Sequence, residues 1–396
     1  MNMSSDNNRT HSGTVIPLFE PEIRGNEYKY VKECLDTNWV SSVGSYVDRF
    51  EHDLASYVGQ EHAVATASGT AALHTALIVA GVEPEDEVLV STLSFIAPAN
   101  AVRYVGAWPV FIDAEPEYWQ MDSQMVVDFL EKKCTWKNSE LRNSTTGRRI
   151  KAVVPVHILG HPVDIDPVIR IAKKFGLIVI EDAAEALGVK YSGKMVGSLG
   201  DISCLSFNGN KIITTGGGGM ILTNHEQWSH RARQLTTQAK DDPVEYIHSE
   251  IGYNYRLSNI LAAVGCAQLE QIDDYINLKR RIAGRYTEAF SNVPGIYPMG
   301  ERNDMFCTYW MYTVLVDESE TGIASRDLMK VLGENDIQAR PLWQPLHLSR
   351  AHGQPKTGCA VAEMIYEKAL SLPCSVGLTE KDQQRVIETV LGTLGQ

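Results

Sequence analysis

The sequence predicts an α/β protein that combines a large, mainly parallel sheet with a smaller C-terminal α/β part. Short apolar strand-like runs alternate with helical segments through the first half of the chain, which is typical of strand–helix–strand units. From about residue 294 the character shifts to a smaller set of strands and helices, enough for a second domain of ordinary size. We therefore predict a disordered N-terminus over 1–15, a large domain over 16–290 and a small domain over 291–396.

Hydrophobic periodicity and turn residues predict the individual elements. Helical spacing is found at 22–36, 46–58, 71–80, 95–104, 121–133, 166–175, 325–332 and 381–394, and helix formers dominate after Glu226, above all over 256–289 with a break near 274. Strand-like runs are found at 62–66, 87–91, 109–113, 151–157, 177–180, 202–207, 220–222, 309–316 and 336–340. The polar stretch 137–149 is predicted to be an exposed insertion. Ligands of such sheets bind at the carboxyl ends of the strands.

Composition and charge exclude several classes of protein. The net charge of −13 argues against nucleic-acid binding, which needs clustered Lys and Arg. The seven cysteines are scattered without a C-x-x-C pair, which fits reduced thiols in a cytoplasmic protein and predicts no structural metal site. The polar N-terminus has no apolar signal core, and no apolar run is long enough to cross a bilayer.

The stretch 201–224 carries the strongest chemical signal in the chain. Lys211 follows a strand and a polar turn, precedes two isoleucines, and is followed by four consecutive glycines. A lysine held against apolar walls can attack a carbonyl and form a Schiff base, and glycines let the backbone approach a flat ligand closely. Taken alone, the stretch is equally well explained as a loop lysine followed by a flexible glycine turn.

Two further segments supply groups that would suit the same ligand. The turn of Ser68, Gly69 and Thr70 between a strand and a helix makes an anion site, although simple capping of that helix is the commoner explanation. Asp182 lies at the end of a strand, where its carboxylate either caps the next turn or pairs with a cationic ring nitrogen. A Schiff-base lysine and an aspartate for a pyridinium nitrogen are the two groups that pyridoxal phosphate requires. Phe95 could then stack on the ring, with core packing as its ordinary alternative, and Ser206 could bind the phosphate.

Five motifs extend this interpretation to a known family. The segments ASGTAALHTAL, SFIAPANAV, EDAAEALG, SFNGNKIITTGGGGM and GYNYRLSNILAAVG resemble, in order and spacing, those of the DegT/DnrJ/EryC1/StrS sugar aminotransferases, which have the fold-type I architecture of pyridoxal-phosphate enzymes. The resemblance runs from about Ile16 to the C-terminus. It implies a cofactor-binding set and a homodimer whose active sites are shared; the set comprises Gly69, Thr70, Phe95, Asp182, Glu185, Ser206, Lys211 and Asn254. Lys211 and Asp182 are the implied catalytic pair, and Asn254 is implied to reach the phosphate of the neighbouring subunit's cofactor. Some relatives carry histidine in place of the lysine and act as dehydratases. The presence of Lys211 argues against that chemistry here.

Glu185 departs from the common pattern of the family, which has glutamine or histidine there. In the family this residue lies near the phenolic oxygen of the cofactor, which would repel an ionised carboxylate. We therefore expect Glu185 to be protonated or turned towards the substrate. The glutamate and the segment NGNKIITT together resemble the enzymes that aminate UDP-4-keto-6-deoxy-N-acetylglucosamine in bacillosamine and legionaminic acid synthesis. That resemblance implies glutamate as the amino donor and a UDP-linked keto sugar as the acceptor.

Three alternatives stay open on the sequence alone. They are a C3 aminotransferase of the same fold, a non-catalytic sugar-nucleotide binder, and a nicotinamide-binding protein; the last lacks a G-x-G-x-x-G after a strand. Arg340, Lys240 and Arg256 are candidates for the sugar diphosphate, although each is more simply explained as a surface charge.

Overall fold

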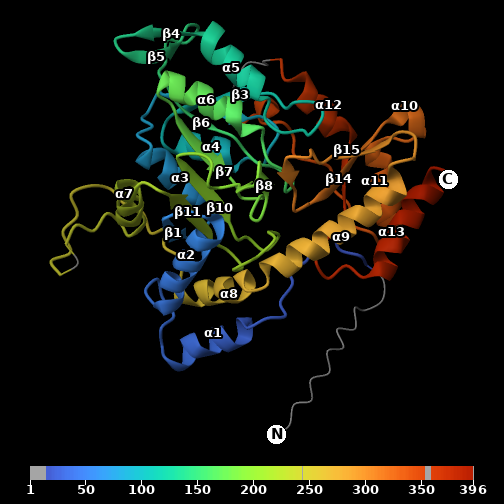
Figure 1. Ribbon diagram of the computed structural model, residues 1–396, viewed down its shortest axis with the longest axis horizontal. Helices are drawn as coiled ribbons and strands as arrows, with labels where there is room; N and C mark the ends of the chain where they lie inside the picture. The colour runs from blue at the N-terminus through green and yellow to red at the C-terminus, as the bar shows by residue number, and fades with distance from the viewer. Residues whose placement is uncertain (1–14, 243, 353–357, 396) are drawn as a thin grey trace.

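A seven-stranded sheet forms the centre of the computed structural model, which describes residues 15–242, 244–352 and 358–395 (Figure 1). Its strands follow the order β1-β11-β10-β7-β6-β2-β3. Their bounds are β1 His62–Thr66, β2 Glu87–Ser91, β3 Trp108–Ile112, β6 Ile150–Val154, β7 Ile178–Asp182, β10 Ile202–Ser206 and β11 Gly219–Thr223. Only β11 runs against its neighbours β1 and β10, so the predicted, mainly parallel sheet is confirmed.

Helices cover both faces of this sheet because its strands are apolar on both faces. In β2, Val88 and Val90 join one core cluster, whereas Leu89 between them joins the other. Helices α3 Gly69–Val79, α4 Ala97–Tyr104 and α7 Glu226–Thr236 contribute to the first cluster. The second includes residues of α2 Ser45–Val58, α5 Ser123–Lys132, α6 Ile165–Phe175 and α8 Asn259–Leu269. Burial on both sides is what a parallel sheet requires.

The C-terminal part contains a second, smaller sheet, to the right in Figure 1. Its antiparallel strands are ordered β12-β14-β15 (Ile296–Pro298, Tyr312–Val316, Ala369–Leu372). The helices around it are α10 Glu318–Thr321, α11 Ser325–Glu334, α12 Ala360–Lys368 and α13 Glu380–Thr393, with a 3-10 turn at Leu346–Leu348. Helix α9 (Ile272–Phe290) leads from the large sheet to this part, and the predicted boundary at 290 coincides with its end. That the two parts are separate domains stays a prediction.

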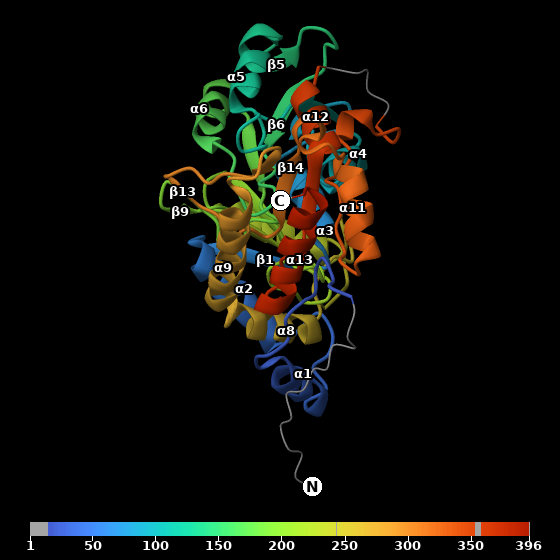
Figure 2. The same cartoon turned by 90° about the vertical axis from the view of Figure 1, so that its right-hand side faces the viewer.

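Peripheral elements complete the molecule. Helix α1 (Glu27–Asp36) lies at one end, and α5, α6 and the hairpin of β4 (Cys134–Lys137) and β5 (Glu140–Asn143) lie at the opposite end (Figure 2). A small sheet joins β13 (Met305–Phe306), β8 (Lys190–Tyr191) and β9 (Lys194–Met195). Among the described residues, no helix combines the length and apolar character needed to cross a membrane.

Several predicted elements differ from those observed. The segment 336–340 is no strand: it has only single bridges from Ile337 to Ile16 and from Arg340 to Ser371. The helical run predicted after Glu226 stops at Thr236 and resumes at Asn259, and the break expected near Asp274 lies before Ile272. Part of the expected insertion 137–149 pairs as a hairpin, and α12 and β15 were missed. The predicted disordered segment lies outside the described residues up to position 14, and Ile16 is held by its bridge.

Candidate active site

A cavity of about 440 Å³ opens at the carboxyl ends of the parallel strands. The loops after β1, β2, β7 and β10 form its walls, and two tryptophans of the C-terminal part, Trp310 and Trp343, complete them. Seven of the eight predicted cofactor-site residues line it: Gly69, Thr70, Phe95, Asp182, Glu185, Ser206 and Lys211. The predicted strand-end position of the site is therefore what the structure has, and the volume lies in the range of small-molecule pockets.

The N-terminus of helix α3 forms one end of this cavity. Ser68 caps the helix in an extended conformation, and its hydroxyl accepts a hydrogen bond from the Ala71 amide at 3.0 Å. The capping explanation is thus correct, but it does not exclude an anion site, because the positive end of the helix dipole still faces the cavity. A Cβ at Gly69 would lie 2.8 Å from the Ser206 Cβ, and one at Gly219 would lie 2.5 Å from the Ser68 carbonyl. Glycine therefore lets the turn, β10 and β11 close into a cradle.

Asp182 is buried at the end of β7 with few partners for its charge. Its side chain is hydrogen-bonded by the Ala184 amide at 3.1 Å, and its main chain is tied to His157 and Pro155 in the neighbouring segment. Burial raises the pKa of Asp182 to about 6, while the nearby charge of Lys211 lowers it. A cation inside the cavity would stabilise the charged carboxylate further.

Lys211 and Glu185 contact each other in the lining of the cavity. The Lys211 Nζ lies 3.3 Å from the Glu185 Oε1, and the side chains are 12% and 7% exposed. The other carboxylate oxygen of Glu185 accepts a hydrogen bond from the Leu159 amide at 3.0 Å. Burial raises the pKa of Glu185, whereas Lys211 opposes that rise. In this structure Glu185 is turned towards Lys211.

The turn before Lys211 explains why the sequence places the amine there. The Lys211 amide donates to the Asn208 carbonyl at 2.9 Å, which closes the turn after β10. The Thr214 hydroxyl donates to the Phe207 carbonyl at 3.1 Å and accepts from the Gly216 amide, so the chain returns towards β11. The glycines thus serve the return into the sheet as well as the cavity wall, to which Gly217 and Gly218 contribute.

Asn254 lies outside this cavity and is exposed. It belongs to an extended segment that bridges to Thr237, while the next residues pair with the end of β1. The candidates for the sugar diphosphate do not line the cavity either. Arg256 is 9% exposed and pairs with Glu51 at 2.9 Å, which is a structural role. Lys240 lies over the Tyr246 ring, 4.5 Å from its centroid.

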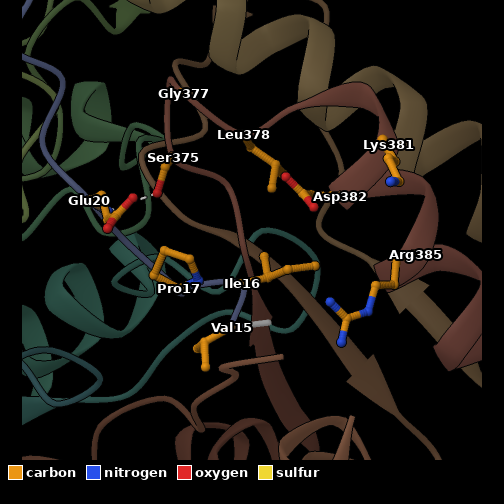
Figure 3. Close-up of a pocket in the computed structure, with 10 residues that line it drawn as sticks. All are labelled: Val15, Ile16, Pro17, Glu20, Ser375, Gly377, Leu378, Lys381, Asp382 and Arg385. Carbon is orange, nitrogen blue, oxygen red and sulfur yellow. Dashed lines mark hydrogen bonds between the residues drawn. The ribbon is translucent and has the colours of Figure 1, made fainter. Parts of the chain in front are cut away.

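A second cavity, of about 390 Å³, lies between residues 15–20 and helix α13 and has a different character (Figure 3). The Glu20 amide is bonded to the Ser375 hydroxyl at 2.8 Å, and Lys381, Asp382 and Arg385 form the helix side. Its charged side chains are Glu20 and the three residues of helix α13. Across the described ranges, no group of three or more His, Cys, Asp or Glu side chains is arranged to hold a metal ion.

Comparison with known proteins identifies the family of the chain. The model of the DegT/DnrJ/EryC1/StrS aminotransferase family matches residues 21–391. The chain belongs to this family. It is 39% identical over 375 residues to the GDP-perosamine synthase of Escherichia coli O157:H7, covering 95% of this chain and 97% of that protein. It is 40% identical over 382 residues to EpsN of Bacillus subtilis (strain 168), a putative pyridoxal phosphate-dependent aminotransferase, covering 95% of each.

The fold agrees with this assignment. The crystal structure of the aminotransferase TlmJ from Streptoalloteichus hindustanus superimposes with a TM-score of 0.86 at 29% identity, covering 96% of this chain and 99% of that one. The protein is therefore a pyridoxal-phosphate-dependent sugar aminotransferase with the predicted α/β fold.

The residues of the cavity fit pyridoxal phosphate. The cradle at Gly69, closed by Ser206, suits a phosphate, and the buried carboxylate of Asp182 suits a cationic ring nitrogen. Lys211 supplies an amine in the same cavity. Sequence reasoning missed Trp310 and Trp343, because no local motif connects them with cavity residues so much earlier in the chain.

Proposed function

We propose that this protein transfers the amino group of glutamate to carbon 4 of a UDP-linked 4-keto-6-deoxy-N-acetylhexosamine. The observation that carries the proposal is the placement of Lys211, Glu185 and Asp182 in one buried cavity with an anion cradle. The substrate itself rests on Glu185 and the segment NGNKIITT, which resemble the enzymes that aminate UDP-linked sugars.

Each wall of the cavity would hold one part of the cofactor. The turn at Gly69 and Thr70, with Ser206, would bind the phosphate at the positive end of α3. Phe95, which is 55% exposed beside the cavity, would stack on the ring, and Asp182 would pair with its nitrogen. The bound cofactor supplies the electron sink that makes proton removal from an amino-acid carbon feasible.

Lys211 would carry the cofactor and move the proton. Its Nζ is an amine in the cavity lining, and it would be the base that takes up a proton from the donor carbon. The nearby Glu185 holds the Nζ by charge and keeps it oriented towards the cavity. Both groups are largely buried, which would limit the access of bulk water to this proton transfer.

A GDP-linked 4-keto sugar is the second candidate acceptor. It is favoured by the relative from Escherichia coli, whose name gives GDP-perosamine as its product. An amino group placed at C3 instead of C4 would also suit the same cavity. The scattered cysteines of the sequence, without a C-x-x-C pair, support a cytoplasmic location for the reaction.

One experiment separates these acceptors. The purified enzyme, loaded with pyridoxal phosphate, is incubated with glutamate and either the UDP-linked or the GDP-linked 4-keto sugar, and NMR of the product locates the new amino group. We expect the UDP-linked acetamido sugar to be aminated at C4 with the higher kcat/KM. Preference for the GDP-linked sugar would replace the acceptor in this proposal, and amination at C3 would replace the position.

We also propose that two copies share each active site, through Asn254. The side chain is exposed and lies off its own cavity, as a residue acting in a partner's site would. Mixing Lys211→Ala subunits with subunits carrying a bulky Asn254 substitution tests this, after tags confirm exchange and folding. Mixed dimers regain activity if Asn254 acts on the partner's site. Absence of recovery means that Asn254 acts in its own subunit.

A further inference from the structure

Trp310 occupies an unusual position between the C-terminal part and the lysine turn. It is 4% exposed and lies in the segment between β13 and β14, after Tyr309, whose φ of 51° is rare for a residue with a side chain. A Cβ at Gly160 would lie 2.4 Å from the Trp310 amide, so this backbone packs directly on the loop that contains Leu159. Close packing of its main chain therefore fixes the position of Trp310.

Two separate contacts connect the indole with Lys211. Its Nε1–H donates to the carbonyl of Asn210, the residue before the lysine, at 2.6 Å. The Lys211 Nζ lies 4.2 Å from the centre of the ring. One tryptophan thus contacts both the backbone that presents the lysine and the amine at the far end of its side chain.

The contacts around the Nζ form a ring of residues that begins and ends at Lys211. Glu185 approaches the Nζ and accepts a hydrogen bond from the Leu159 amide. The next residue, Gly160, packs on the Trp310 backbone, and Trp310 returns to Lys211. The amine is therefore positioned both by the carboxylate of Glu185 and by the ring face of Trp310.

The geometry points to Trp310 as a positioning residue for Lys211, an inference that rests on the proposed role of Lys211 as the cofactor lysine. The ring face attracts the ammonium group through its quadrupole, most strongly where water is excluded. Unlike Glu185, an indole cannot accept the proton of the amine, so it holds the Nζ without competing in proton transfer. The Nε1–H bond fixes the turn and hence the start of the lysine side chain.

Two variants separate the two contacts. Trp310→Phe keeps an aromatic face but loses the N–H donor, whereas Trp310→Leu loses both. Trp136→Phe is the matched control, because Trp136 is an exposed residue of the β4–β5 hairpin with no contact to the cavity. Thermal unfolding of each full-length variant establishes that it is folded.

The first readout is the reactivity of Lys211 itself. The full-length chain, freed of cofactor with hydroxylamine, is pulsed with an acetylating reagent, and mass spectrometry gives the labelling rate of Lys211 relative to the exposed Lys330. We expect Trp310→Leu to label Lys211 about fivefold faster, the order expected for loss of one desolvated cation–π contact. Trp310→Phe stays within about twofold of wild type, since it keeps a ring face.

The second readout is the turn. Amide exchange of the peptide containing Asn210 and Lys211 in the loaded enzyme should accelerate in both variants and not in the control. Transamination should lose kcat in Trp310→Leu, with the KM for the sugar nearly unchanged. Unchanged labelling together with unchanged exchange overturns the inference. If Trp310→Leu does not fold, the exchange rate of Trp310→Phe alone decides, with wild-type exchange overturning it.

The labelling assay uses neither sugar nor cofactor, so it fails independently of the proposed function. If borohydride fixes the cofactor of wild type to another lysine, the proposed function fails, whatever Trp310 does. If borohydride fixes it to Lys211 and both readouts are unchanged, only the inference about Trp310 fails.

Discussion

Two adjacent carboxylates on β7 occupy opposite environments. Glu181 and Asp182 are both buried, but successive residues of a strand point to opposite faces. Glu181 accepts hydrogen bonds from the amides of Gly197, Leu199 and Gly200 and from His157, and these partners hold its pKa below the usual value against the effect of burial. Asp182 has a single amide donor, and burial raises its pKa to about 6.

The difference separates a carboxylate that is satisfied within the protein from one that has room for a further partner. His157 accepts the Val163 amide through its Nδ1, so its ring proton is on Nε2 and is donated to Glu181. Glu181 is thus satisfied within the protein and anchors the loop at 197–200. Asp182 is left short of partners on the side that faces the cavity, which is where a cationic ligand would complete it.

The largest expected effect comes from removing Lys211, whose charge lowers the pKa of Asp182. Lys211→Ala is expected to lose transamination entirely, because it removes the amine that we propose carries the cofactor and moves the proton. Borohydride should fix the cofactor of wild type to the peptide containing Lys211. A wild-type rate in Lys211→Ala, or fixation at a different lysine, contradicts the assignment.

Asp182→Asn is expected to cost at least about a hundredfold in turnover, in line with the loss of one strong preorganised electrostatic contact. An amide is nearly the same size but cannot hold the proton of a ring nitrogen by charge. Steady-state kinetics with saturating pyridoxal phosphate measures this. A loss below about threefold would mean that Asp182 only caps its turn.

Glu181→Gln is expected to lower the stability of the protein more than its turnover, in contrast to Asp182→Asn. Its NH₂ group would face amide donors, and disrupting a buried charged network costs about 3 kcal/mol of unfolding free energy. Because the folded pKa of Glu181 is depressed, this loss is full above the carboxyl's ordinary value of 4.5 and shrinks as the pH falls below it. Urea unfolding of wild type and variant at pH 7 and at low pH tests whether the loss of stability shrinks as the pH falls. A greater loss of turnover per folded molecule than in Asp182→Asn would remove the distinction between the two carboxylates.

Glu185→Gln is expected to have the smallest effect. This third carboxylate lies between the extremes, since it has one amide donor and the charge of Lys211. We expect the variant to bind the cofactor and to retain measurable turnover, because the amide oxygen still accepts from Leu159. Absorbance of the purified protein and a glutamate-dependent assay measure both. A cofactor-free variant would show that Glu185 is required for cofactor binding.

Most of the cavity could be predicted from the sequence because its residues follow parallel strands. The ends of such strands meet at one edge, so Ser68, Asp182 and Ser206 gather there without any knowledge of loop structure. Lys211 follows from the turn and the glycines near it. The roles of these residues came from the resemblance to the family, and they stay predictions.

The rest depended on contacts that no local pattern records. Trp310 reaches the lysine turn through a hydrogen bond across a hundred residues of sequence. The four partners of Glu181 come from two loops, so its difference from Asp182 is invisible in the pair Glu-Asp. The false strand at 336–340 alternates polar residues with the apolar Ile337 and Ala339, but the backbone there forms one bridge on each side instead of a ladder. Helix α12 passes directly into β15 at Lys368, with no turn residue to mark the change.

The stability of the cofactor-free protein as a function of pH tests the central claim most directly. The folded pKa of Asp182, about 6, lies above its ordinary value of 3.8, so wild type loses stability as the pH rises through that window and stays penalised above it. The shift corresponds to a penalty of about 3 kcal/mol. Cofactor-free Asp182→Asn should therefore be more stable than wild type at pH 8, equally stable near pH 4, and less stabilised by added pyridoxal phosphate. A variant that is less stable than wild type at pH 8 would show that Asp182 is already satisfied within the protein, and the account of the cavity would be wrong.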